Sequence, residues 1–243
     1  MIAIKHIEAG LVLALVLALV PAFAPARAAG NECRLLGPGA PPHVSFTLQP
    51  SNVNWHYDKT RDQIRVLRAN SGGKVAAVGP NWQSIGLTLA TTILAVDVRV
   101  EAVPLRESKP GAAAPEYCAR LIAADVKFGS SRIDAYVARD YRQGSCPFRV
   151  VRDHEGKHIA VHRNAVERYA PLIEKRLREA APALPMVRAA DPKKGAERLR
   201  KALHDDLSRI FDAMRKDVDK NNGALDTHEA YANERQLCPR GDW

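Results

Sequence analysis

The hydrophobic pattern of this chain changes its period near residue 148, and this change constrains the fold more than any other feature of the sequence. From about 43 to 148, short segments rich in Val, Ile and Thr are separated by Pro- and Gly-containing turns, which is typical of β-strands. From there on, apolar residues recur every three or four positions, as in helices that bury one face. Strands followed by helices predict an α+β fold, with an N-terminal antiparallel-rich β-sheet, a long helix and a C-terminal helical part.

Individual strands and helices can be placed along both parts. We expect strands in "HVSFTL", "DQIRVLRA" and "GLTLATTILAVDVRVEAV", the last as one long strand or a hairpin pair, and in "ARLIAADVKFG" and "RIDAYVARDY", joined by a turn at "GSS". We expect helices over 149–180 and 193–217, the second ended by "DKNNG". A short third helix in "DTHEAYANERQL" is capped by Asp226 or Thr227.

The first 28 residues have the features of a secretory signal peptide: a weakly positive start, the apolar run "GLVLALVLALVPAFA" and the cleavage signal "ARA". We expect cleavage after Ala28; the alternative, an uncleaved anchor, is disfavoured because Pro21 and Pro25 interrupt the run. No later stretch is apolar enough to span a bilayer, so we predict a periplasmic or secreted protein without stable membrane insertion. The chain then divides into the signal peptide (1–28), an N-terminal β-rich region (29–116) and the region 117–243.

Four cysteines follow the predicted cleavage site, namely Cys33, Cys118, Cys146 and Cys238. Outside the cytoplasm, an even number of cysteines predicts two disulfides. Of the three possible connectivities we favour Cys118–Cys146, which would brace the segment leading into the long helix, and Cys33–Cys238, which would join the two ends of the chain.

The chain is basic, with 36 Lys and Arg against 27 Asp and Glu and a formal charge of +9. The basic residues are dispersed and interleaved with acids, as in "EKRLREAAP", and few aromatic residues accompany them. This pattern indicates a solvated basic surface rather than a nucleic-acid interface, so we predict no nucleic-acid partner. The sequence does not determine the oligomeric state.

The long predicted helix carries "HEGKH" at residues 154–158. His154 and His158, four residues apart, project from one face of a helix and can bind one Zn²⁺. Glu155 lies beside that face, where it can act as general base toward a metal-bound water. The alternative is an ordinary solvated histidine face.

Catalytic zinc usually has three protein ligands, so one more ligand must come from elsewhere. His162 lies about 6 Å further along the helix axis than His158, too far to join the same tetrahedron. Val161 and Asn164 break the extended pattern of metzincins. If the two long helices pair antiparallel, the region 216–229 returns to the level of "HEGKH". The candidates are Asp226, His228, Glu229 and Glu234. We predict His228 as the third ligand, with Glu229 as the next choice.

The same region has a second metal interpretation. The stretch "DVDKNNGALDTHE" is similar to the calcium loop of EF-hands, but Gly223 and Glu229 are each one residue late for that loop. A turn built on Asn-Gly is therefore the favoured interpretation.

The run "RIDAYVARDYRQGSCPFRVVRDHEGKHIAVH" and the later "GALDTHEAYANERQLC" resemble bacterial predicted secreted zinc-dependent proteases, a family with an HExxH domain of unknown function. The resemblance covers about residues 117–243 and is sharpest at Cys146 and "HEGKH". It implies a zincin-like or gluzincin-like metallopeptidase region, with His154 and His158 as ligands and Glu155 as base. It also implies that "RIDAYVA" is the strand beside the cleft, where it pairs with an extended peptide.

These features together predict a periplasmic or secreted zinc metallopeptidase that acts on peptide or protein substrates. Tyr169 and Tyr231 are equal candidates for stabilising the oxyanion. The alternative function is that of a non-catalytic envelope protein that binds a metal or a partner. A third ligand and an open coordination position distinguish the two.

Overall fold

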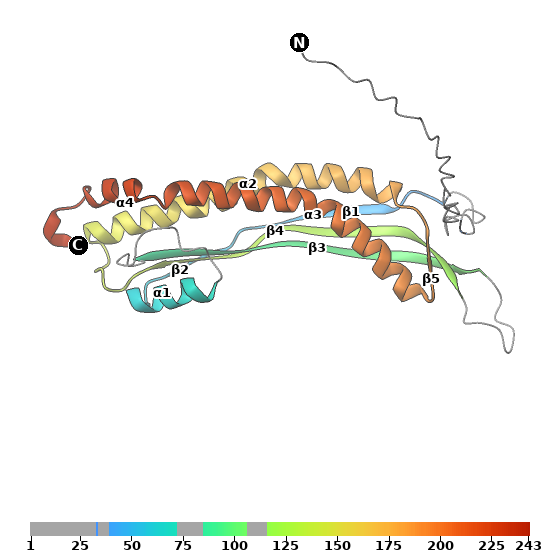
Figure 1. The fold of residues 1–243 in the computed structure, drawn as a ribbon, viewed down its shortest axis with the longest axis horizontal. Helices are drawn as coiled ribbons and strands as arrows, with labels where there is room; N and C mark the ends of the chain where they lie inside the picture. Colours follow the sequence, from blue (N-terminus) through green and yellow to red (C-terminus); the bar gives the residue numbers. More distant parts are fainter. Residues whose placement is uncertain (1–32, 34–38, 72–84, 106–115) are drawn as a thin grey trace, which may run out of the picture.

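The computed structural model describes residues 33, 39–71, 85–105 and 116–243, and the predicted signal peptide lies outside this part of the chain. Its elements are shown in Figure 1. In chain order they are β1 (His43–Gln49), β2 (Val53–His56), α1 (Arg61–Asn70), β3 (Gly86–Pro104), β4 (Tyr117–Val137), α2 (Cys146–Ala183), β5 (Val187–Ala189), α3 (Pro192–Leu225), α4 (His228–Arg235) and a short 3₁₀ turn (Arg240–Asp242).

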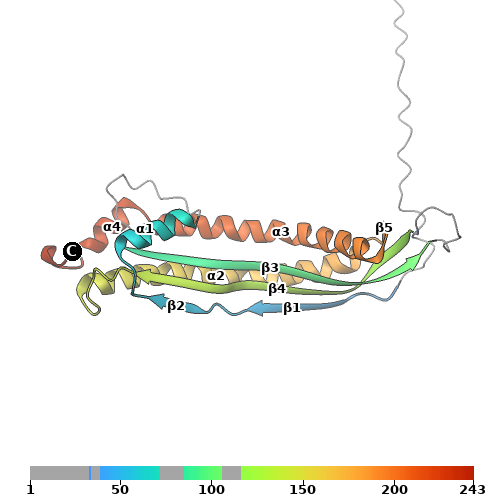
Figure 2. The ribbon, with the colours of Figure 1, turned by 90° about the horizontal axis from the view of Figure 1, so that it is seen from below.

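Strand β4 is the centre of the sheet, since every other described strand pairs with it. Strands β1 and β2 lie in line along one edge of β4 and run parallel to it, while β3 and β5 pair with it antiparallel (Figure 2). The fold is therefore α/β, with a parallel β1–β4–β2 path and with helix α1 and strand β5 interleaved among the other elements. The predicted α+β fold with an antiparallel-rich N-terminal sheet is wrong. Periodicity identifies strands, but it does not say which strand each will pair with.

The segment "DQIRVLRA", predicted as a strand, is helix α1. Its start is fixed by a capping box: the Gln63 amide donates to Thr60 Oγ1 (3.2 Å) and the Thr60 amide donates to Gln63 Oε1 (2.9 Å). Ile64 is fully buried among Leu87 and Tyr136 of the sheet. The capping box at Thr60 and Gln63 therefore marks the start of a helix, although the residue types of the segment had favoured a strand.

The predicted turn at "GSS" is also absent, because β4 continues through it as one strand of 21 residues. Gly129 adopts a φ of +142°, and the register against β3 shifts between Thr91 and Thr92. Such a bulge accommodates one extra residue and twists the strand without ending it. The partner segment is likewise one long strand, β3, rather than a hairpin pair.

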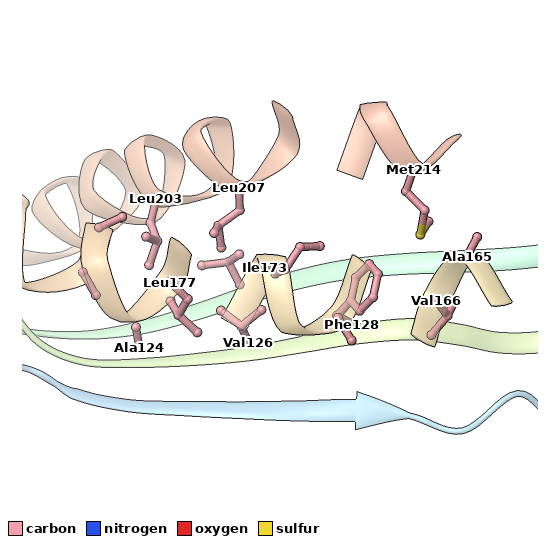
Figure 3. Close-up of a cluster of buried hydrophobic side chains, with 14 of the residues drawn as sticks. Ala124, Val126, Phe128, Ala165, Val166, Ile173, Leu177, Leu203, Leu207 and Met214 are labelled. Carbon is pink, nitrogen blue, oxygen red and sulfur yellow. The ribbon is translucent and has the colours of Figure 1, made fainter. Parts of the chain in front are cut away.

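Helices α2 and α3 pack antiparallel on one face of the sheet, and α1 covers the other face near one end (Figure 1). Two ion pairs join the helices, Arg168 with Asp217 and Arg176 with Asp206. The residue numbers rise along α2 while they fall along α3, as expected for antiparallel helices. Between the helices and the sheet lies the main hydrophobic core (Figure 3). Its labelled members include Val126, Phe128, Ile173, Leu177, Leu203, Leu207 and Met214. The predicted antiparallel helix pair is confirmed, although α3 runs through "DKNNG" to Leu225.

The structure contains two disulfides, as predicted, but their connectivity is Cys33–Cys118 and Cys146–Cys238. The favoured pairs were wrong because the 21 residues of β4, about 70 Å at 3.3 Å per residue, separate Cys118 from the start of α2. Disulfides of this kind are typical of proteins outside the cytoplasm. Among the described residues, no helix is both long and apolar enough to cross a membrane.

Replacement of Leu207, which is fully buried between α3 and the sheet, tests this core. Leu207→Ala should lower the free energy of unfolding by about 2–5 kcal/mol, because it removes buried methyl groups and leaves a cavity. The matched control is Leu172→Ala, on α2, where the side chain is 48% exposed and the expected loss is at most about 0.5 kcal/mol. Urea unfolding measures both; equal losses would contradict the described core.

Candidate metal centre

Two imidazoles and one carboxylate converge where the end of α3 meets the first third of α2. His154 Nε2 lies 3.0 Å from His158 Nε2. Each of these nitrogens lies 3.3 Å from Asp226 Oδ1. Asp226 directly follows the last residue of α3, so the antiparallel helix pair carries it to the histidines. Both histidines are buried.

The spacing of these three atoms is that of metal ligands. Tetrahedral zinc with ligands at about 2.0–2.1 Å places neighbouring ligand atoms about 3.3–3.4 Å apart. The triangle formed here has sides of 3.0, 3.3 and 3.3 Å. The three atoms therefore match one face of a coordination tetrahedron and leave its fourth corner to another ligand.

The hydrogen-bond partners of the two Nδ1 atoms support the tautomer in which both Nε2 atoms can bind a metal ion. His154 Nδ1 lies 3.0 Å from Glu234 Oε2, and His158 Nδ1 lies 2.9 Å from Asn222 Oδ1. The amide nitrogen of Asn222 faces His162 Nε2 at 3.4 Å, which is consistent with its oxygen facing His158. When both Nδ1 atoms donate to these acceptors, the lone pairs of both Nε2 atoms point at each other and at the Asp226 carboxylate.

In that tautomer three electron-pair donors face one another, an arrangement that a divalent metal ion between them would satisfy. The outward atoms of each ligand are also held: Glu234 and Asn222 hold the histidines, while Arg68 of α1 lies 4.0 Å from Asp226 Oδ2. Such partners orient metal ligands and raise their affinity for the ion. His154, His158 and Asp226 can therefore hold a metal ion.

Glu155 is buried on the side of α2 that faces strand β3. Thr88 Oγ1 donates a hydrogen bond of 2.7 Å to Glu155 Oε2. Gly86 lies beside the other carboxylate oxygen, and a Cβ atom at this position would overlap Glu155 Oε1. His154, Glu155, Gly86 and Tyr231 line one small cavity, so the carboxylate faces the same space as a predicted ligand.

Burial and neighbouring charges shift the pKa values in the site. Burial raises the pKa of Glu155, an effect that the nearby histidines and the Thr88 hydroxyl only partly offset. Burial also acts to raise the pKa of Asp226, but the adjacent His154 and His158 imidazoles and the hydroxyl of Tyr231, which donates to Asp226, outweigh burial and hold this pKa well below the ordinary value. Asp226 is therefore an anion in the folded protein.

The structure places the other predicted ligands outside this group. His228 and Glu229 lie in the first turn of α4 and are exposed, while Asp226 is the carboxylate beside the histidines. The sequence placed the whole region 216–229 level with "HEGKH" but did not order the candidates within it. Because α3 continues to Leu225, Asp226 directly follows the helix and is the residue brought to the histidines. The EF-hand interpretation fails for the same reason, because Asp217, Asp219 and Asn221 are all helical.

The structure also shows where the two candidate tyrosines and the "RIDAYVA" strand lie. Tyr231 donates a hydrogen bond to Asp226, and its ring centroid lies 4.9 Å from that of His154, whereas Tyr169 packs against the main core. The "RIDAYVA" segment lies inside the sheet between β2 and β3, so it has no free edge for a peptide. The strand beside Glu155 is β3.

The sequence analysis did not identify Glu234, Asn222 and Arg68 as residues that hold the proposed ligands in place. It considered Glu234 only as a ligand, and nothing in the sequence signals the roles of Asn222 and Arg68, which depend on long-range packing.

Comparison with known proteins identifies no match among family models, curated proteins or solved structures.

Metal analysis of the residue 29–243 chain, purified oxidised and without chelator, tests the ligand set. We expect one zinc per chain, and we expect His154→Ala and Asp226→Ala to weaken zinc binding by more than the roughly 10- to 100-fold that loss of an outer partner costs. His228→Ala is the matched control and should bind zinc like the parent. Zinc loss in His228→Ala with normal binding in Asp226→Ala would restore the original assignment.

Proposed function

We propose that this protein is a zinc-dependent metallopeptidase that acts in the periplasm or outside the cell, with Glu155 as general base. The observation that carries the proposal is the triangle of His154 Nε2, His158 Nε2 and Asp226 Oδ1, with sides of 3.0–3.3 Å, next to a buried glutamate that faces the same cavity. The two disulfides support an oxidising compartment.

Two histidines and one carboxylate are a ligand set of catalytic zinc, which keeps one coordination position open. Zinc held there would lower the pKa of a bound water to about 7 and polarise a peptide carbonyl. The protein supplies the geometry: His154 and His158 are fixed by the helix, and Glu234 and Asn222 fix the orientation of their rings.

Glu155 would accept the proton of the attacking water and then deliver it to the leaving amine. The Thr88 hydroxyl holds Oε2, which leaves Oε1 for this exchange. Gly86 keeps the space beside Oε1 free of a side chain. Burial of the carboxylate restricts the access of competing water. Helix α2 carries Glu155 and strand β3 supplies Thr88 and Gly86, so the two elements together fix the position of the proposed base.

Tyr231, rather than Tyr169, is the candidate for stabilising the oxyanion. Tyr231 lies against His154 and lines the cavity shared with Glu155, and its one hydroxyl proton is donated to Asp226. A shift of this hydrogen bond from Asp226 to the substrate would let it stabilise negative charge that develops beside the ligands.

Glu155→Gln tests the general base with minimal change of shape. The variant should keep its zinc and lose hydrolysis of an unstructured protein substrate by about 100- to 10,000-fold, the range for general acid–base catalysis. Fluorescent casein cleavage and zinc content are measured on the same samples. Undiminished cleavage would exclude Glu155 as the base. A zinc-loaded parent that cleaves no protein or peptide would instead support the non-catalytic alternative.

A pair of glycine substitutions tests the position of the carboxylate. Gly86→Ala should displace Glu155 and reduce cleavage at least about tenfold with zinc retained, because the new methyl group overlaps Oε1. Gly156→Ala is the control: a Cβ there meets nothing within 4 Å, so activity should persist. Helix propensity predicts that this control gains about 0.5–1 kcal/mol in free energy of unfolding. Equal activity in both variants would contradict the role of Gly86.

A further inference from the structure

The last part of the chain supports the metal centre but has little core of its own. From Asp219 to Trp243, Cys238 is the only buried residue, with 6% of its surface exposed. Helix α4 has no buried residue at all. Yet α4 carries Tyr231 and Glu234, both of which contact His154.

Cys238 is joined to Cys146, the first residue of α2. Helix α2 is also the helix that carries both histidines, and Cys146 precedes His154 by about two turns. The segment from Asp226 to Cys238 therefore begins at one proposed metal ligand. It ends at a disulfide to α2, the helix that carries the other two proposed ligands, His154 and His158. Figures 1 and 2 both show α4 at the same end of the molecule as the start of α2.

We propose that the Cys146–Cys238 disulfide is a positioning element of the metal centre, which holds Glu234 and Tyr231 against His154. Opening it would release α4, weaken metal binding and leave the body of the fold intact. The part concerning metal affinity rests on the proposed metal site, whereas the part concerning α4 does not.

Apart from the disulfide, α4 is held by polar contacts of Glu234 and Tyr231 and by the packing of Trp243, and none of these contacts buries a residue of α4. An isolated helix of eight residues is not stable in water. The ion pair of Glu234 with Lys157 involves a half-exposed lysine and contributes at most about 1 kcal/mol. Trp243 packs near Val137, Phe148 and Val151, but it follows Cys238 in the chain and belongs to the same anchored segment.

The second disulfide provides a matched control. Cys118 lies at the start of β4, where its neighbours are Val103 of β3 and Arg188 of β5. This is the end of the sheet opposite to α4 (Figure 1). Its loss should destabilise the protein in the usual way of disulfides without reaching the ligands.

The first experiment compares zinc affinity in Cys146→Ser/Cys238→Ser and Cys33→Ser/Cys118→Ser by competition with a chromophoric chelator. We expect the first variant to bind zinc about 10- to 100-fold more weakly, the effect of losing outer partners, and the second to match the parent. Both should melt at lower temperature, so melting alone does not separate the two roles. Equal zinc affinity in both variants would overturn the coupling to the metal.

Glu234→Gln tests whether the disulfide acts on zinc affinity through Glu234 or only through the stability of the fold. In the parent this substitution should weaken zinc binding about tenfold or more, because His154 Nδ1 loses its carboxylate partner. In Cys146→Ser/Cys238→Ser it should have little further effect, since α4 has already moved away. Full additivity of the two effects would show that the disulfide does not act through Glu234.

Hydrogen exchange of the metal-free protein tests the same idea without zinc. Amides of 228–238 should lose protection in Cys146→Ser/Cys238→Ser, while those of α2 and α3 keep theirs; unchanged protection would overturn the proposal. If this variant does not fold, Cys33→Ser/Cys118→Ser, which keeps only the Cys146–Cys238 disulfide, is treated with a phosphine. The phosphine cleaves S–S, and water supplies the oxygen of the phosphine oxide and the protons of the two thiols. Iodoacetamide then alkylates the thiols with loss of iodide, and the same exchange is measured. A parent that binds no zinc would overturn the metal site, and this measurement would still decide the role of the disulfide.

Discussion

The antiparallel packing of α2 against α3 determines where every functional group of this molecule lies. The pair is held by an apolar core that includes Ile173, Leu177, Leu203 and Leu207, and on its outer side by ion pairs such as Arg176 with Asp206. Because both helices are long and regular, the position of one residue fixes the level of all others. Asp226, which directly follows α3, therefore reaches His154 and His158.

The metal centre concentrates buried polar groups, which are costly unless each has a partner. Here the outward nitrogen of each histidine is hydrogen bonded, by Glu234 and by Asn222, and the Glu155 carboxylate is held by Thr88. The groups left facing one another are the three atoms that could hold a metal ion. A site that satisfies its outer atoms and leaves its inner ones converging is organised for a bound cation.

The correct and incorrect expectations divide along a physical line. Helix α2, the start of helix α3 and the presence of a capped α4, whose cap is Thr227 of the two candidates Asp226 and Thr227, were predicted, because periodicity and capping are local properties. The parallel pairing of β1 and β2, the uninterrupted course of β4 and the disulfide connectivity were not. Each of these depends on a partner far away in the chain, and a bulge such as that at Gly129 is indistinguishable in sequence from a turn.

The sequence by itself determined two histidines on one helix face, a glutamate between them and a returning second helix, because a spacing of four residues and an apolar stripe have one meaning on a helix. Only the tertiary structure decided that Asp226 joins the two histidines in a group that could hold a metal ion, that β3 flanks Glu155, and that Cys146 bonds Cys238. The reason is length: α3 extends two turns beyond its expected end, and β4 runs the length of the sheet. Each added residue lengthens a helix or strand by a fixed distance, so a small error in where the element ends changes which side chains come into contact.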